Sequence, residues 1–148
     1  MANRLAFLEH TADVGIDVVA EDLTGLFRTA AFGMFELLMG GEDSPHHHDS
    51  PRPDPTEAPG IRHFELRAMD AASLLVDWLR ELLFMHETDG LCITGIEFRV
   101  LTDQELDATV QCVPYHGQPV REIKGVTYHQ LVVEREDSAW HARVIFDV

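Results

Sequence analysis

The sequence predicts an α+β domain in which two helices pack on one face of a mostly antiparallel sheet, as a two-layer sandwich. Two stretches carry apolar residues at helical spacing, whereas most of the remaining chain alternates apolar and polar residues as a strand does. Short polar turns join the strands of the last third and favour antiparallel hairpins. We expect residues 1–148 to form a single domain with one core. A chain of this length buries, on folding, about 70% of the surface that its unfolded form exposes.

The first part of the chain predicts one strand followed by one helix. A strand is expected from Val14 to Ala20, where every second side chain is apolar. A helix is expected from Leu23 to Leu38, because apolar residues recur there at intervals of three and four. Asp22 is expected to cap the N-terminus of this helix, and the two glycines at 40–41 are expected to end it.

The rest of the chain predicts a second strand and helix, and then strands alone. Alternation marks a strand at 61–68, and Asp70 caps a helix that ends near Gly90. Five further strands are expected, at 93–101, 106–113, 120–124, 126–134 and 140–148.

Residues 42–60 are predicted to form a mobile surface loop. The segment holds five prolines and few apolar side chains, so it lacks the means to bury itself against a core. Its three consecutive histidines, 46–48, could catch a transition metal, but a flexible loop does not hold adjacent histidines in a ligand geometry. A solvated loop is therefore the favoured interpretation.

The charge of the chain excludes one class of function. Asp and Glu number 26 against 11 Lys and Arg, for a formal charge of −15, and this excess opposes direct, non-specific binding of nucleic acid. No apolar run reaches the roughly 20 residues that span a bilayer, and the N-terminus lacks the apolar stretch of a signal peptide. The expected location is the cytoplasm, where Cys92 and Cys112 serve as buried thiols.

Three positions carry polar groups that folding alone does not require: Asp13 at the start of a strand, Asp147 beside the C-terminal carboxylate of Val148, and Lys124, the only lysine. If the first strand lies near the last, these carboxylates form an oxygen-rich site for Mg²⁺ or Ca²⁺, or a site clamped by lysine. The alternative is that Asp13 caps a turn and Asp147 is a solvated terminal residue.

Histidines provide weaker candidates. His10, His129 and His141 could each act as a general base or metal ligand, but lone histidines at strand ends more often have structural partners. The sequence contains no phosphate-binding glycine loop, nucleophile elbow or zinc motif.

Four segments together resemble the archease family. They are Phe7–Gly15 (FLEHTADVG), Leu75–Leu83 (LVDWLRELL), Arg121–His129 (REIKGVTYH) and the ending Val144–Val148 (VIFDV). Their order and spacing agree with the family over nearly the whole chain outside the proline-rich loop. The chain departs from the family in small ways: Gly125 stands where alanine is more frequent, and Arg80 where asparagine is common.

The resemblance implies an accessory protein rather than an enzyme. Its partner would be the RNA ligase RtcB, which joins RNA ends bearing a 2′,3′-cyclic or 3′-phosphate to a 5′-hydroxyl, as in tRNA splicing. Archease promotes the GTP-dependent guanylylation of the ligase's active-site histidine and so allows multiple turnover. An acidic chain would contact tRNA only indirectly, through a ligase surface basic enough to hold RNA.

The resemblance also implies roles for individual residues. Lys124 would act in activation of the partner, and a divalent cation, Ca²⁺ or Mg²⁺, would be held by Asp13, Asp147 and Val148. Residues expected to support this site from nearby are His10, Glu122 and His129.

The sequence is also compatible with two other functions. A small divalent-metal-dependent phosphohydrolase would use Asp13 and Asp147 for its metal and His10 as base. A chaperone-like module would bind other proteins through a sheet face or the proline-rich loop, with no role for the acidic tip.

Overall fold

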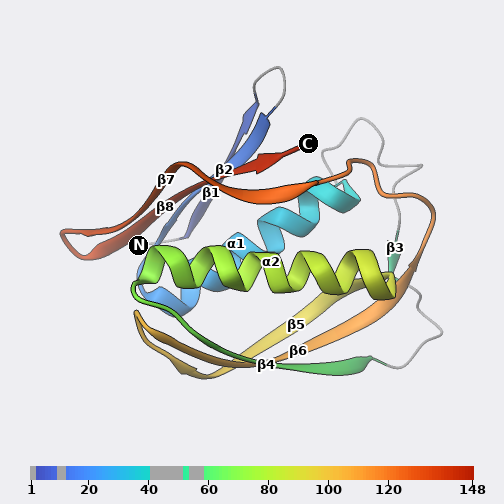
Figure 1. Cartoon of the computed structure of the whole chain (residues 1–148), viewed down its shortest axis with the longest axis horizontal. Coiled ribbons are helices and arrows are strands. Elements are labelled where there is room, and N and C mark those ends of the chain that lie inside the picture. The colour runs from blue at the N-terminus through green and yellow to red at the C-terminus, as the bar shows by residue number, and fades with distance from the viewer. Residues whose placement is uncertain (1–2, 10–12, 41–51, 54–58) are drawn as a thin grey trace.

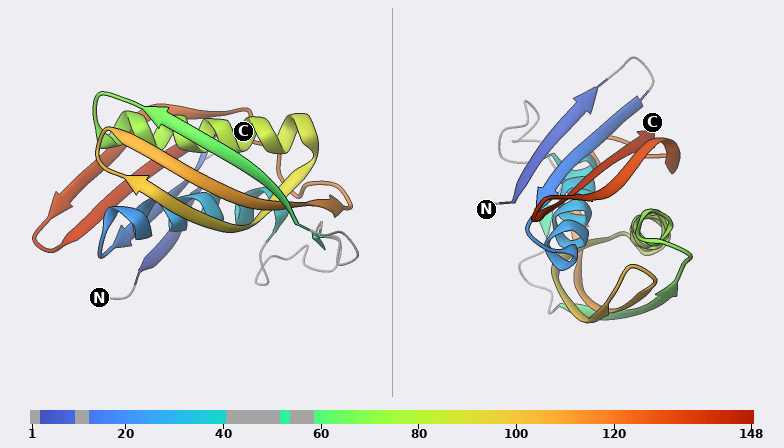
Figure 2. Two further views of the ribbon diagram at one scale, coloured as in Figure 1. Left: turned by 90° about the horizontal axis from the view of Figure 1, so that it is seen from below. Right: turned by 90° about the vertical axis from the view of Figure 1, so that its left-hand side faces the viewer.

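The computed structural model describes residues 3–9, 13–40, 52–53 and 59–148. Its strands form two antiparallel sheets, with the two helices between them (Figure 1). The α+β class, with two helices packed on antiparallel strands, is confirmed. The division of the strands into two sheets, one on either side of the helices, is a further finding (Figure 2).

The first sheet has the strand order β1-β2-β8-β7. These strands are β1 (Arg4–Glu9), β2 (Asp13–Ala20), β7 (Gly125–Glu136) and β8 (Ala139–Asp147). The sheet therefore brings together strands from opposite ends of the chain, because β8 pairs with β2 over the whole length of β2. Strand β1 is absent from the sequence-based prediction: the side chain of Phe7 is 46% exposed, so its residues lack a clean alternation of buried and solvated positions.

The second sheet is built around β6 (Glu105–His116). Strand β4 (Gly60–Arg67) pairs with one edge of β6, and β5 (Leu91–Leu101) pairs with the other as a hairpin. A two-residue strand, β3 (Arg52–Pro53), pairs with β6 at Tyr115 and His116. Residues 52–53 thus have strand partners within the segment that the sequence predicts to be a loop. Residues 42–51 and 54–58 lie outside the described residues, and the mobility of that segment stays a prediction.

The helices begin and end where the sequence predicts. Helix α1 (Leu23–Met39) begins after Asp22, whose carboxylate accepts a hydrogen bond from the Gly25 amide at 2.7 Å. Helix α2 (Ala71–Asp89) begins after Asp70, which caps the Ser73 amide at 2.8 Å. Both helices end at a glycine with positive φ, a conformation that glycine adopts without a Cβ clash. Neither helix is long and apolar enough to cross a membrane.

One core lies between the sheets and around the helices. Trp78 of α2 is fully buried at its centre, donates its indole N–H to the Phe27 carbonyl of α1 at 3.2 Å, and contacts the rings of Phe64 and Phe98 in the second sheet. Cys92 and Cys112 are buried and free, as the sequence predicts.

The predicted strand at 120–124 is wrong. This segment is irregular, and its amides find partners outside any strand ladder. Val120 N–H donates to the Leu38 carbonyl at the end of α1 at 2.8 Å, and Lys124 N–H donates to the Asp147 carbonyl at 2.6 Å. The apolar residues of this segment are typical of a strand. Ile123 is indeed buried, with 1% of its surface exposed, but it is buried because the connection packs across the end of α1.

Candidate functional site

The candidate site lies at one edge of the first sheet, where β2 begins, β8 ends and β7 begins. In the antiparallel register, Asp13 is paired directly with Asp147, and Asp147 is paired on its other side with Gly125. Directly paired residues point to the same face of a sheet with Cβ atoms about 4.5–5.5 Å apart. The fold therefore places the two carboxylates side by side from opposite ends of the chain.

These carboxylates occupy the face that points away from the helices. The next residue along each strand, Val14 on β2 and Phe146 on β8, is buried in the core. Because successive side chains of a strand alternate between faces, Asp13 and Asp147 point outward. Asp13 is half-buried and Asp147 is exposed, so a ligand can reach both.

A close approach of β2 and β8 shapes the outer face next to the two carboxylates. A Cβ added to Gly15 would lie 2.6 Å from the Val144 carbonyl oxygen and 2.8 Å from Cδ1 of Ile145. Ile145 is 4% exposed, so its side chain covers the glycine on this outer face. The glycine of the segment 7–15 is therefore required by packing, two residues from Asp13.

Lys124 completes this edge. Its backbone N–H donates to the Asp147 carbonyl at 2.6 Å, and its side chain is exposed. Among the described residues, no ion pair joins its ammonium group to either Asp13 or Asp147. The three residues that the sequence singles out are thus neighbours in the fold, with an ammonium group and two carboxylates available to a ligand or partner.

The three residues expected to support the site have different outcomes. His10 lies outside the described residues. Glu122 is exposed and lines a hollow of about 530 Å³ at the end of α2, together with His86 and Tyr115. His129 is exposed in a bulge of β7, where pairing with β8 is interrupted between Thr127 and Val132. Whether Glu122 and His129 assist the carboxylates stays a prediction.

His141 has a structural partner. Its Nε2 lies 2.5 Å from a carboxylate oxygen of Asp17 on the neighbouring strand β2, and its Nδ1 lies 3.9 Å from Glu134 on β7. This arrangement ties three strands of the first sheet together, which agrees with the structural interpretation of this histidine.

Arg80 is a contributor that sequence reasoning missed. From α2, its Nε and Nη2 both donate to the carbonyl of Val126, at 3.1 and 2.8 Å, and its guanidinium lies 5.2 Å from the ring centre of Tyr128. It therefore fixes the start of β7 two residues beyond Lys124. The helical pattern gives no sign of this role, because an arginine at the edge of an amphipathic stripe usually reaches into solvent.

Comparison with known proteins gives a consistent assignment. The model of the archease protein family matches residues 6–148, which is nearly the whole chain. The chain belongs to the archease family. The archease of Methanothermobacter thermautotrophicus is 32% identical, covering 96% of each protein, and that of Methanopyrus kandleri is 34% identical, covering 95% of this chain and 96% of the relative.

Solved structures agree with the archease assignment. The solution structure of Methanobacterium thermoautotrophicum protein 1598 has a TM-score of 0.68 at 32% identity and covers 97% of this chain and 98% of its own. The crystal structure of a Thermotoga maritima protein described as an archease and possible chaperone has a TM-score of 0.64. At 20% identity, over 95% of this chain and 94% of its own, it shows likeness of fold alone.

The four segments that resemble archease converge in the fold. Residues 7–15 contribute Asp13, residues 144–148 contribute Asp147, and residues 121–129 contribute Lys124. The helical segment 75–83 reaches the same edge through Arg80. The archease motifs thus meet around one edge of the first sheet, although they are spread over the full sequence.

Proposed function

We propose that this archease-family chain is an accessory protein of the RNA ligase RtcB and not itself an enzyme. In this role it promotes the GTP-dependent guanylylation of the ligase and its multiple turnover in tRNA splicing and RNA repair. The observation that carries the proposal is the pairing of Asp13 with Asp147 beside Lys124, at the edge where the archease motifs meet.

The charge of the chain supports docking on a protein partner. A formal charge of −15 favours contact with a basic surface, and a ligase surface that holds RNA is basic. Contact with tRNA would then be made by the ligase, and the acidic chain would approach the ligase from the edge that carries Asp13 and Asp147.

The donor set at this edge fits a hard divalent cation. Asp13 and Asp147 supply carboxylate oxygens on one face, and Val148, the next residue in sequence, would add a main-chain oxygen. Oxygen is the ligand type that Ca²⁺ and Mg²⁺ prefer. When bound, such a cation supplies positive charge for the phosphates of the GTP that the ligase uses. Asp13 and Asp147 would hold it, and Lys124 would add a movable ammonium group for the same phosphates or for the ligase.

The proposal is tested by measuring guanylylation of purified RtcB with GTP and a divalent cation, with and without this chain. We expect the parent chain to accelerate guanylylation and the Asp13→Asn variant to lose that acceleration. Asp137→Asn is the matched control, because Asp137 lies in the β7–β8 turn at the other end of the sheet, with a φ of 54° that asparagine also adopts. Equal acceleration by the parent and by Asp13→Asn contradicts the proposal.

A chaperone-like role is the second candidate, because the Thermotoga maritima relative is described as a possible chaperone. Large exposed apolar side chains, Ile61, Met69 and Phe84, are available for such contacts. This role predicts that the chain suppresses aggregation of an unfolded protein and that Asp13→Asn does so equally well. Hydrolysis of a phosphoester by the isolated chain with Mg²⁺ or Mn²⁺ would instead favour the phosphohydrolase alternative.

A further inference from the structure

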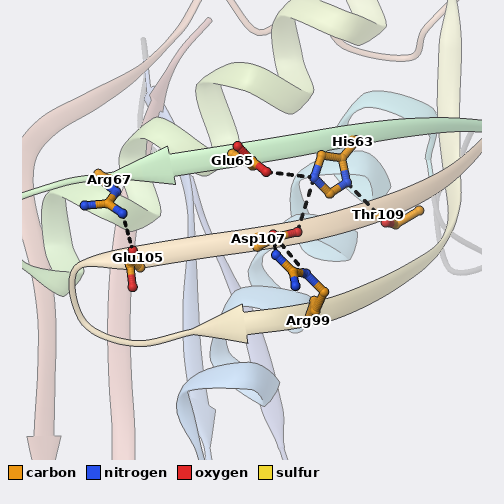
Figure 3. Close-up of polar contacts among 7 residues, drawn as sticks. All are labelled: His63, Glu65, Arg67, Arg99, Glu105, Asp107 and Thr109. Carbon is orange, nitrogen blue, oxygen red and sulfur yellow. Dashed lines mark hydrogen bonds and ion pairs between the residues drawn. The ribbon is translucent and has the colours of Figure 1, made fainter.

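The outer face of the second sheet carries a polar cluster that lies away from Asp13, Lys124 and Asp147. His63 and Glu65 on β4 and Asp107 on β6 project from this face toward one another (Figure 3). The adjacent residues on these strands, Phe64 and Ala108, face the core. The two helices separate this sheet from the one that carries Asp13 and Asp147, so the cluster is independent of the proposed accessory function.

The ligating atoms of the cluster converge on a single point. His63 Nε2 lies 3.4 Å from Glu65 Oε1 and 3.3 Å from Asp107 Oδ1, and all three atoms lie within 4.8 Å of one another. A proton on Nε2 satisfies only one oxygen at a time, because the ring N–H points in one direction. An ion placed among the three atoms would contact all of them.

Arg99 holds Asp107 through one carboxylate oxygen, and the other oxygen accepts no hydrogen bond. The residue is 6% exposed, and its Oδ2 accepts hydrogen bonds from Nε and Nη2 of Arg99, the former at 3.0 Å. Arg99 therefore places a positive charge directly beside this carboxylate. Its Oδ1 accepts no hydrogen bond and faces His63 and Glu65. A buried carboxylate oxygen without a hydrogen bond is the kind of atom that a cation satisfies.

The other nitrogen of the imidazole also has a partner. His63 Nδ1 lies 3.4 Å from the Thr109 hydroxyl on β6. Metal-ligating histidines commonly use one nitrogen for the metal and hydrogen-bond the other to a neighbouring group, which fixes the orientation of the ring. Thr109 therefore orients His63, and Arg99 orients Asp107.

We propose that His63, Glu65 and Asp107 form a binding site for a divalent transition metal ion of the Zn²⁺ class. In a tetrahedral site with bonds of about 2.0–2.1 Å, ligand atoms are separated by about 3.3 Å, which matches both distances from His63 Nε2. The imidazole nitrogen selects Zn²⁺ over Mg²⁺ or Ca²⁺, which prefer oxygen donors alone.

The fourth position of this site faces solvent. The side chains of His63 and Glu65 are 51% and 72% exposed, and a hollow of about 480 Å³ lies beside the cluster, lined by Glu65, Arg67, Arg99 and Asp107 among others. A water molecule or a small anion fits the open position, with the two arginines near it.

The test is a titration of the metal-free full-length chain with Zn²⁺ by calorimetry, and with Co²⁺ by visible absorption. Both titrations use a background in which His46, His47 and His48 are replaced by serine, because three consecutive histidines would also bind these ions. We expect one site per chain and the intense visible bands of tetrahedral Co²⁺. His63→Ala and Glu65→Gln should each lower the affinity at least tenfold and abolish the bands.

Glu97→Gln is the matched control for charge. Glu97 is exposed on β5, is paired with Thr109 across the strands, and is not one of the three ligands, so its removal should leave affinity unchanged. His63 and Glu65 are exposed, and thermal unfolding should show that their variants fold as the parent does. Absence of one-to-one binding in the background chain, or equal affinity in His63→Ala, overturns the site.

Discussion

Asp13 and Asp147 stand directly opposite each other on neighbouring strands, although they come from opposite ends of the chain. Like charges in this relationship destabilise a sheet. The same two strands could have carried an oppositely charged or apolar pair at this position, which would have stabilised the edge. The pair therefore opposes folding, which supports the proposal that this edge binds a cation.

Replacing one of these carboxylates should separate stability from ligand binding. In EDTA, we expect Asp13→Asn to raise the free energy of unfolding by at most about 1 kcal/mol, because it removes the like-charge contact. Millimolar Ca²⁺ should raise the melting temperature of the parent but not that of the variant, since a ligand of the folded state stabilises it by mass action. Thermal unfolding with EDTA and with Ca²⁺ measures both effects, and an equal Ca²⁺ shift in both proteins would remove Asp13 from the cation site.

Substitutions of Lys124 should change activation without changing the fold. Its side chain is exposed, so we expect the stability of Lys124→Ala to lie within about 0.5 kcal/mol of the parent. The variant should fail to stimulate guanylylation of the ligase. Lys124→Arg should stimulate guanylylation only partly, because a planar guanidinium replaces a compact ammonium group. Full stimulation by Lys124→Ala would exclude the lysine from the mechanism.

Gly15 and Gly125 should respond differently to alanine. A Cβ at Gly15 meets the Val144 carbonyl oxygen at 2.6 Å, and this backbone atom moves only if β2 and β8 separate. We expect Gly15→Ala to lower the free energy of unfolding by about 1–3 kcal/mol, as overpacking does. A Cβ at Gly125 meets nothing within 4 Å, so Gly125→Ala should have the stability of the parent. Urea unfolding measures both variants, and equal stability of the two would contradict the close approach.

The buried thiols should make the protein sensitive to alkali. Burial, with a smaller contribution from Cys112, raises the pKa of Cys92 from 9.0 to about 11. Because the folded state holds this proton more tightly than the unfolded state does, the protonated thiol stabilises the folded protein at pH values below the unfolded pKa. That contribution should be lost as the pH rises from about 9 to about 11, because the unfolded state ionises first.

Cys92→Ala should therefore show a shallower loss of stability over this range in urea unfolding at pH 8 and at pH 10.5. At pH 8, iodoacetamide should modify neither Cys92 nor Cys112 in the folded parent and both in urea, because both side chains are buried. Rapid modification of the folded protein would show that the thiols are accessible.

The helices, their capping residues and the hairpins of the last third follow from sequence alone, because they depend on neighbours within a few residues. Asp22 and Asp70 were recognisable as caps, and the β5–β6 and β7–β8 hairpins join strands through short turns. Asp13, Lys124 and Asp147 were also recognisable, since they interrupt patterns that folding alone would satisfy with other residues.

The tertiary structure decided which distant strands pair. Alternation shows that a strand has one buried face, but it does not show which neighbour covers its edge, because closing a long loop depends on the packing of the whole core. The pairing of β2 with β8 brings Asp13 to Asp147, and the pairing of β4 with β6 brings His63 to Asp107. The irregular path of 120–124 has the same origin: its amides bond to the end of α1 and to Asp147, partners that exist only once the helices and the first sheet have assembled.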